Sequence, residues 1–163
     1  MTERIQVYRR AGRKAARYLI KHQRPNGAFI DEGFREDVYH KNCYSLSVAG
    51  FWSEAHRLAT WVRDNELRPS GELLHCYSPG RMQVYKDAWM LHGVHRLARF
   101  EISYPLMDWI ATFQAPCGGF VCEGREDAWV RSLTTAWCGV AALYVGRLDV
   151  AHRAGNCLLQ MLE

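Results

Sequence analysis

The chain has 163 residues, of which 48% are apolar, and a formal net charge of +4, which is enough apolar material for the core of one domain. No apolar run approaches the ~20 residues that a membrane-spanning helix needs, and the charged first residues do not resemble a secretory signal. We interpret the six cysteines as thiols in a reducing compartment, and predict one cytoplasmic domain without a membrane span.

The first predicted helix, residues 4–23, carries most of the positive charge. Residues 1–24 contain eight Lys or Arg and one Glu, whereas the rest of the chain is mildly acidic. The basic residues recur at helical spacing, which is typical of a solvated helix face. We favour this interpretation over a membrane or nucleic-acid contact, so nucleic acid is not a predicted partner.

Three sequence landmarks recur along the chain with a period in the forties. The first is an aromatic residue, then a polar residue, then a glycine: Tyr18, Gln23 and Gly27; Trp61, Glu66 and Gly71; Trp109, Gln114 and Gly119. The second is an arginine placed four residues before an aromatic residue. The third aligns Tyr44, Trp89 and Trp137. Such a period is typical of paired-helix units or propeller blades.

Periodicity within the unit favours helices, because residues 104–114 place their apolar side chains on one helical stripe. We predict an all-α, α/α-toroid-like array of helical hairpins with helices at residues 4–23, 38–50, 54–66, 84–97, 104–115, 129–145 and 150–162. Ser53, Ser103 and Asp149 are the predicted N-caps of three of them. One domain, 1–163, then contains repeats at about 4–52, 53–102 and 103–147 and a last helix at 150–162.

Long connections at 24–37, 67–83 and 116–128 alternate with short turns in this scheme. Connections of this length within a compact domain are usually functional. In an up-and-down array all three lie at the end where the second helix of each pair begins. This end is therefore the predicted functional face.

Two segments carry a resemblance to a known family. KAARYLIKHQRPNGAF, residues 14–29, resembles the QW-type repeat of terpene cyclases, such as the squalene-hopene cyclases, and of protein prenyltransferase β subunits. WIATFQAPCGGF, residues 109–120, is similar, and residues 61–73 form a degenerate middle copy. The resemblance implies an α/α toroid with concentric inner and outer helices, glutamines that cap helix ends, and a substrate cavity inside the inner ring.

The chain is shorter than a full toroid, which has more helix pairs. We expect an incomplete ring that a second copy, a partner chain or further residues complete, so a homo-oligomer is among the predicted partners. The chain has neither the Asp-x-Asp-Asp acid motif of the cyclases nor the zinc-binding Asp-x-Cys pair of the prenyltransferases. The resemblance therefore implies the fold and a cavity, and not either of these mechanisms.

Arg35, Arg81 and Arg125 come just before the predicted inner helices. Guanidinium groups at helix N-termini can bind a carboxylate or a phosphate, which predicts a small-molecule ligand with an anionic group. The alternative is that these arginines pair with neighbouring carboxylates and brace their loops.

Asp37, Asp87, Asp127 and His40 are the candidate catalytic residues, since carboxylates and histidine move protons in acid–base catalysis. Desolvation beside an apolar cavity raises the pKa of a carboxyl group, as a proton donor requires. Asp37 and Asp127 can instead be helix caps, whereas Asp87 lies inside a predicted helix.

Aromatic residues at repeat positions are the further candidates for substrate binding: Tyr39, Tyr44, Tyr85, Trp89, Trp129 and Trp137. In a hollow ring their faces can stabilise cationic or conjugated ligands, and the alternative is that they are core residues. His92 and His95 are three residues apart but lack a convincing set of further ligands, so we predict no metal and no cofactor.

These observations favour a non-redox cyclase, isomerase or lyase that uses acid–base chemistry on a largely apolar small molecule, which can carry an anionic group. A non-catalytic ligand-binding or assembly module is one alternative. A sugar-modifying α/α toroid, such as an epimerase or a lyase, is another.

Overall fold

The computed structural model describes residues 3–29, 39–74, 83–121 and 129–162. These residues form an all-α array, which confirms the predicted fold class. The helices are α1 (Glu3–Lys21), α2 (Asn42–Ala49), α3 (Trp52–Asn65), α4 (Gln83–Arg96), α5 (Phe100–Ala111), α6 (Ser132–Tyr144) and α7 (Leu148–Gln160). None of these helices is long and apolar enough to cross a bilayer.

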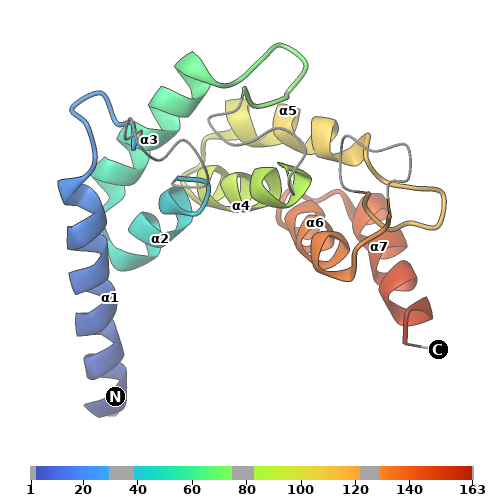
Figure 1. Ribbon diagram of the computed structural model, residues 1–163, viewed down its shortest axis with the longest axis horizontal. Helices are drawn as coiled ribbons and strands as arrows, with labels where there is room; N and C mark the ends of the chain where they lie inside the picture. The colour runs from blue at the N-terminus through green and yellow to red at the C-terminus, as the bar shows by residue number, and fades with distance from the viewer. Residues whose placement is uncertain (1–2, 30–38, 75–82, 122–128, 163) are drawn as a thin grey trace.

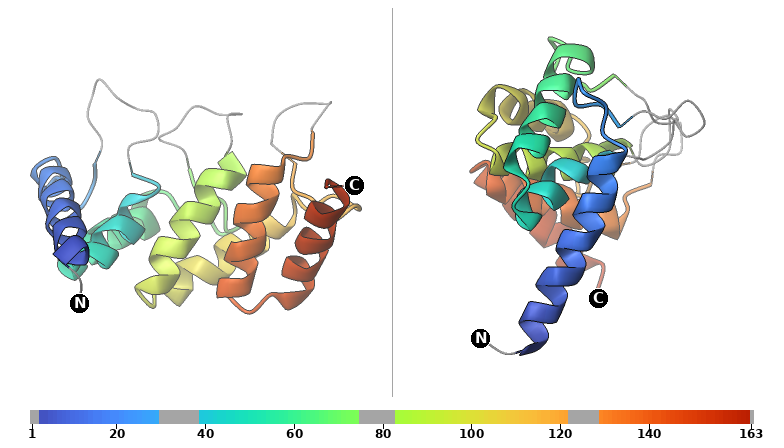
Figure 2. Two further views of the ribbon diagram at one scale, coloured as in Figure 1. Left: turned by 90° about the horizontal axis from the view of Figure 1, so that it is seen from below. Right: turned by 90° about the vertical axis from the view of Figure 1, so that its left-hand side faces the viewer.

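The helices form an open arc with two layers (Figure 1). α2, α4 and α6 lie side by side along its concave side, and α3 and α5 lie on its convex side. Each inner helix packs against the outer helix that follows it, so α2–α3, α4–α5 and α6–α7 are hairpins. α1 and α7 lie at the two ends, and α1 projects beyond the arc (Figure 2).

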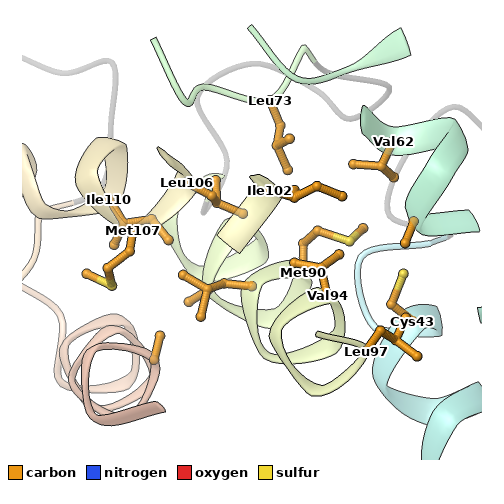
Figure 3. Close-up of a cluster of buried hydrophobic side chains, with 14 of the residues drawn as sticks. Cys43, Val62, Leu73, Met90, Val94, Leu97, Ile102, Leu106, Met107 and Ile110 are labelled. Atoms are coloured by element: carbon orange, nitrogen blue, oxygen red, sulfur yellow. The ribbon is translucent and has the colours of Figure 1, made fainter. Parts of the chain in front are cut away.

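The core lies between the two layers, where α3, α4 and α5 meet (Figure 3). Ile102, Leu106 and Ile110 occupy every fourth position of α5 and are fully buried, as expected for the buried stripe of an amphipathic helix. Met90 and Val94 of α4 are fully buried beside them. Burial of one such side chain contributes roughly 1.5–3 kcal/mol, so this contact holds the two layers together.

The three short turns share one backbone conformation. Gly50, Ala98 and Gly146 have positive φ angles of 88°, 57° and 78° and recur every 48 residues. A left-handed residue here ends the inner helix, and the outer helix begins two residues later.

This turn geometry overturns the predicted N-caps Ser53, Ser103 and Asp149. The outer helices begin earlier, at Trp52, Phe100 and Leu148, and none has a side-chain cap hydrogen bond. Because the turn directs the chain straight into the helix, the three polar residues already lie within the first turns.

Two glutamines tie long connections to the next outer helix. Nε2 of each donates one hydrogen bond to a loop glycine carbonyl and one to the carbonyl of the third residue of that helix: Gln23 to Gly27 (3.1 Å) and Glu54 (2.9 Å), and Gln114 to Gly118 (2.8 Å) and Val150 (3.0 Å). The fold therefore uses these glutamines as links between consecutive repeats.

The structure corrects the repeat alignment by one residue. Gly27, Gly71 and Gly118 have φ angles of 99°, 88° and 88°, and a Cβ at any of them would collide with the backbone of the next outer helix. The equivalent glycine of the third copy is thus Gly118 and not Gly119. Leu67 and Gln114 occupy the same place in a backbone bridge, so Leu67, and not Glu66, replaces the glutamine in the middle copy.

Two inner helices begin later than predicted. α2 starts at Asn42 rather than at 38, and α6 starts at Ser132 rather than at 129. Tyr39, His40 and Trp129 therefore precede these helices instead of lying on them.

Candidate ligand-binding surface

Four half-buried aromatic side chains of the inner helices form a continuous group, which we call the aromatic strip: Tyr44 of α2, Tyr85 and Trp89 of α4, and Trp137 of α6. The ring centroids of Trp89 and Trp137 are 3.9 Å apart, with 38° between the ring planes. Trp89 also makes edge contacts with Tyr44 at 6.0 Å and Tyr85 at 6.5 Å. Partly open aromatic rings can bind apolar groups and cations.

Parallel packing of the inner helices explains why these residues meet. Trp89 and Trp137 lie nine residues before the left-handed residues Ala98 and Gly146, whereas Tyr44 lies six residues before Gly50, so Tyr44 is about one helical turn away from the position at which the sequence aligned it. The side-by-side inner helices nevertheless bring the three rings together across the concave side of the arc. The structure therefore joins four of the six predicted aromatic residues into one surface.

A lysine lies at the edge of the aromatic strip. Lys41 Nζ is 5.2 Å from the ring centroid of Trp89 and 5.7 Å from that of Tyr85, within the range of cation–π contacts. The Lys41 side chain is exposed. It thus places a positive charge beside the apolar rings, where an anionic group of a ligand can reach it.

His92 lies next to the aromatic strip and is only 2% exposed. Its ring is 5.5 Å from Trp137 and 4.7 Å from Tyr144. Burial lowers its pKa, an effect that a hydrogen bond to the backbone of Trp137 opposes and the nearby charge of His95 reinforces. Nε2 has no hydrogen-bond partner in the described part of the chain. His92 is therefore mainly neutral at pH 7, and its Nε2 is buried without a partner among the described residues.

His95 links the inner and outer layers. Its Nδ1 lies 3.0 Å from Oγ of Ser103 in α5, and its ring packs against Phe100 at 5.1 Å and Tyr104 at 5.9 Å. Burial lowers its pKa as well. Within the described ranges no group of three or more His, Cys, Asp or Glu could hold a metal ion.

Asp87 is fully buried in α4. Counted back from the left-handed turn residues Gly50, Ala98 and Gly146, it occupies the repeat position of Tyr39, just before α2, and of Thr135 in α6, which are also buried. Oγ1 of Thr135 accepts a hydrogen bond from the backbone N–H of Phe120 at 2.9 Å and so braces the segment that precedes the inner helix. This repeat position is structural in the third copy, and the role of Asp87 as a proton donor stays a prediction.

Tyr39 and His40 are buried just before α2, at 1% and 7% exposure. Tyr39 packs edge-on against Trp61 of α3, with ring centroids 5.7 Å apart. It belongs to the hydrophobic core, which is the alternative that the sequence left open for the aromatic residues.

Trp129 is the one remaining predicted site residue in the part of the chain that the structure describes. Trp129 is 67% exposed and precedes α6. The predicted anion-binding residues and two of the catalytic candidates lie outside the described residues: Arg35, Arg81 and Arg125, and Asp37 and Asp127.

Sequence reasoning considered His92 only as half of a metal-ligand pair with His95. A second signal was present, because His92 follows Trp89 by three residues and thus shares a helix face with it. The contact with Trp137, on another helix, could come only from the tertiary structure.

No protein-family model matches this chain, and no curated protein matches it. The geometry of the aromatic strip and of His92 is therefore the observation from which a function can be argued.

Proposed function

We propose that this chain is a toroid segment that binds a largely apolar small molecule on the aromatic strip and catalyses a non-redox isomerisation or cyclisation of it. The observation that carries the proposal is the unpartnered Nε2 of His92 beside the stacked rings of Trp89 and Trp137. Four half-buried rings favour an apolar or conjugated ligand, and Lys41 favours one with an anionic group.

The proposed proton acceptor is His92. A neutral imidazole carries its hydrogen on one ring nitrogen, and the lone pair of the other nitrogen can accept a proton; the proposal assigns the lone pair to Nε2. Nε2 takes a proton from a carbon of the ligand and returns it at another carbon, which leaves the ligand's composition unchanged. Tyr144 is 44% exposed and 4.7 Å from His92, so rotation of this ring would give a bound ligand access to the imidazole.

The proposal also includes the anion-binding arginines and the second chain that the sequence predicts. Arg35, Arg81 and Arg125 would add positive charge for an anionic group, and a second copy or a partner chain would close the cavity above the strip. A sugar-modifying toroid is the second candidate, because exposed indole and phenol rings also stack on sugar faces.

Tryptophan fluorescence tests the binding proposal. The probes are a C15 isoprenoid alcohol, its carboxylic acid and cellotetraose, each titrated into the whole chain. We expect both isoprenoids to change the emission, the acid to bind more tightly, and Trp137→Leu to weaken binding about tenfold or more. Trp52→Leu is the matched control, because Trp52 lies on α3 and is 45% exposed.

Three results would reject or redirect the proposal. Unchanged isoprenoid binding by Trp137→Leu would exclude the strip as the site. Binding of cellotetraose alone would favour the sugar-modifying alternative. Incubation with the acid in D₂O separates binding from catalysis: deuterium incorporation that is lost in His92→Gln supports the base, and its absence with intact binding indicates a binding module.

A further inference from the structure

A groove of about 870 Å³ lies between α1 and α2, and Tyr44 of the aromatic strip lies at one of its walls. We call it the α1–α2 groove. Its α1 wall is an apolar stripe that includes Ile5, Tyr8, Ala16 and Leu19, and its α2 wall includes Val48. These residues of α1 follow helical spacing, so they form one continuous face.

This face is covered only near the C-terminal end of α1. Ala16 is buried, whereas Ile5 is 42% and Tyr8 64% exposed. At Gly12, which also lines the groove, a Cβ would meet no atom within 4 Å. The N-terminal half of α1 projects beyond the arc (Figure 2), with its apolar stripe directed along the groove.

The repeat register shows what shape fits the groove. Ser45, Gly93 and Ala141 occupy the same position of α2, α4 and α6, five residues before the left-handed residues Gly50, Ala98 and Gly146. Gly93 packs so closely on α2 that a Cβ there would lie 2.5 Å from Cβ of Cys43, and Ala141 is fully buried, but Ser45 is exposed and lines the groove. The open face of α2 is therefore the face by which the other inner helices pack, and a helix is the shape that fits it.

The positive charge of the groove indicates what kind of partner helix would bind there. α1 contains seven Lys or Arg and one Glu, and α2 has no charged residue. Arg9 and Arg13 line the groove itself. A helix with acidic residues on both sides of an apolar stripe would complement this surface, whereas pairing of α1 with the α1 of a second copy would bring two strongly basic helices together.

A lipid surface fits less well. A basic amphipathic helix binds a bilayer when its apolar face lies flat on the membrane. Here α2 stands beside the apolar stripe of α1 and forms the second wall of the groove. A flat surface cannot enter a corner between two helices, but a third helix can.

We propose that the α1–α2 groove binds an acidic amphipathic α-helix of a partner protein. The mode is helix-in-groove recognition, in which apolar anchors at helical spacing give affinity and flanking charges fix the orientation. This proposal does not depend on the aromatic strip being a catalytic site.

The test uses a labelled helical peptide of about the length of α1, with leucines at helical spacing and flanking glutamates, and a second peptide in which lysine replaces glutamate. Binding to the whole chain is measured by fluorescence anisotropy. We expect the acidic peptide to bind, the lysine peptide not to bind, and added salt to weaken binding. Gly12→Leu fills the groove and should weaken binding about tenfold or more.

Gly155→Leu on α7 is the matched control, because Gly155 is also a helical glycine with open space at its Cβ. It should leave peptide binding unchanged. If Gly12→Leu does not fold by circular dichroism, Val48→Glu takes its place, since the exposed Val48 tolerates a polar side chain and a carboxylate there repels the acidic peptide.

Several outcomes would overturn the proposal. These are failure of the acidic peptide to bind, equal binding of both peptides, and full binding by Gly12→Leu. A concentration-dependent dimer in sedimentation that Gly12→Leu abolishes would assign the groove to a second copy. Binding to phosphatidylserine vesicles that Gly12→Leu abolishes would assign it to a membrane.

Discussion

Trp89 of α4 and Trp137 of α6 lie with their ring centroids 3.9 Å apart, and this pair is the point where two inner helices and the buried His92 meet. His92 contacts both rings, at 6.3 Å and 5.5 Å. Because these rings bury His92, the packing of the aromatic strip affects the pKa of His92. The pH dependence of the free energy of unfolding therefore tests this packing.

We predict that His92 makes the fold less stable in acid. Burial lowers its pKa below the ordinary 6.5, so its contribution to stability is complete above that value and is lost as the pH falls through the lowered pKa. His92→Leu should flatten the acid side of a plot of unfolding free energy against pH, measured in urea. His152→Leu, at an exposed position of α7, is the control; equal curves for His92→Leu and the unaltered chain would contradict the prediction.

Glu66 should have the opposite effect. Its side chain is 7% exposed, Oε2 has no hydrogen-bond partner in the described part of the chain, and burial raises its pKa from 4.5 to about 7. Stability is therefore complete below pH 4.5 and is lost as the pH rises through 7.

Glu66→Gln should remove this loss and raise the thermal unfolding midpoint above pH 7, since the amide is neutral at every pH. The measurement is a series of melting curves from pH 5 to pH 8.5, with the exposed Glu3→Gln as a control. A variant that is less stable than the unaltered chain at the alkaline end would contradict the assignment of Glu66 as a buried, unpaired carboxyl group.

Two helical glycines should respond in opposite directions to alanine. At Gly93 a Cβ would meet Cβ of Cys43 at 2.5 Å and the backbone nitrogen of Tyr44 at 2.7 Å, so Gly93→Ala should force α2 and α4 apart and cost about 1–3 kcal/mol. At Gly155 nothing lies within 4 Å, so Gly155→Ala should stabilise the fold by up to about 1 kcal/mol. Urea unfolding of both variants checks this, and the same sign for both would count against the tight α2–α4 contact.

Ala98→Gly should stabilise the chain by about 1 kcal/mol, because Ala98 has a φ of 57° and a left-handed conformation costs a residue with a Cβ about that much. The two equivalent turns already have glycine, at Gly50 and Gly146. Calorimetric melting of Ala98→Gly, with Gly50→Ala as the reverse change, tests the shared turn. Similar melting temperatures for all three proteins would show that the turn conformation is not strained.

The sequence predicted the helices more accurately than their ends. The apolar stripe of residues 104–114 indicated the buried face that α5 presents to α4, because helical periodicity is a local property. The N-caps failed, since the left-handed residues Gly50, Ala98 and Gly146 start the outer helices, and an alanine gives no signal of that conformation. Glu66 was aligned with the glutamines because spacing alone cannot show that Leu67 occupies their place in the backbone bridge.

The sequence by itself determined the all-α fold class and the recurring hairpins, because both follow from periodicity along one chain. It aligned Tyr44 with Trp89 and Trp137, but the turns at Gly50, Ala98 and Gly146 set a register that is three residues different for α2. Only the tertiary structure decided which polar groups are buried and unpaired, as at His92 and Glu66, and which apolar faces stay open, as at Val48 and Tyr8. Whether a side chain is buried depends on residues of other helices. These residues are far away in the sequence, so a local sequence pattern does not identify them.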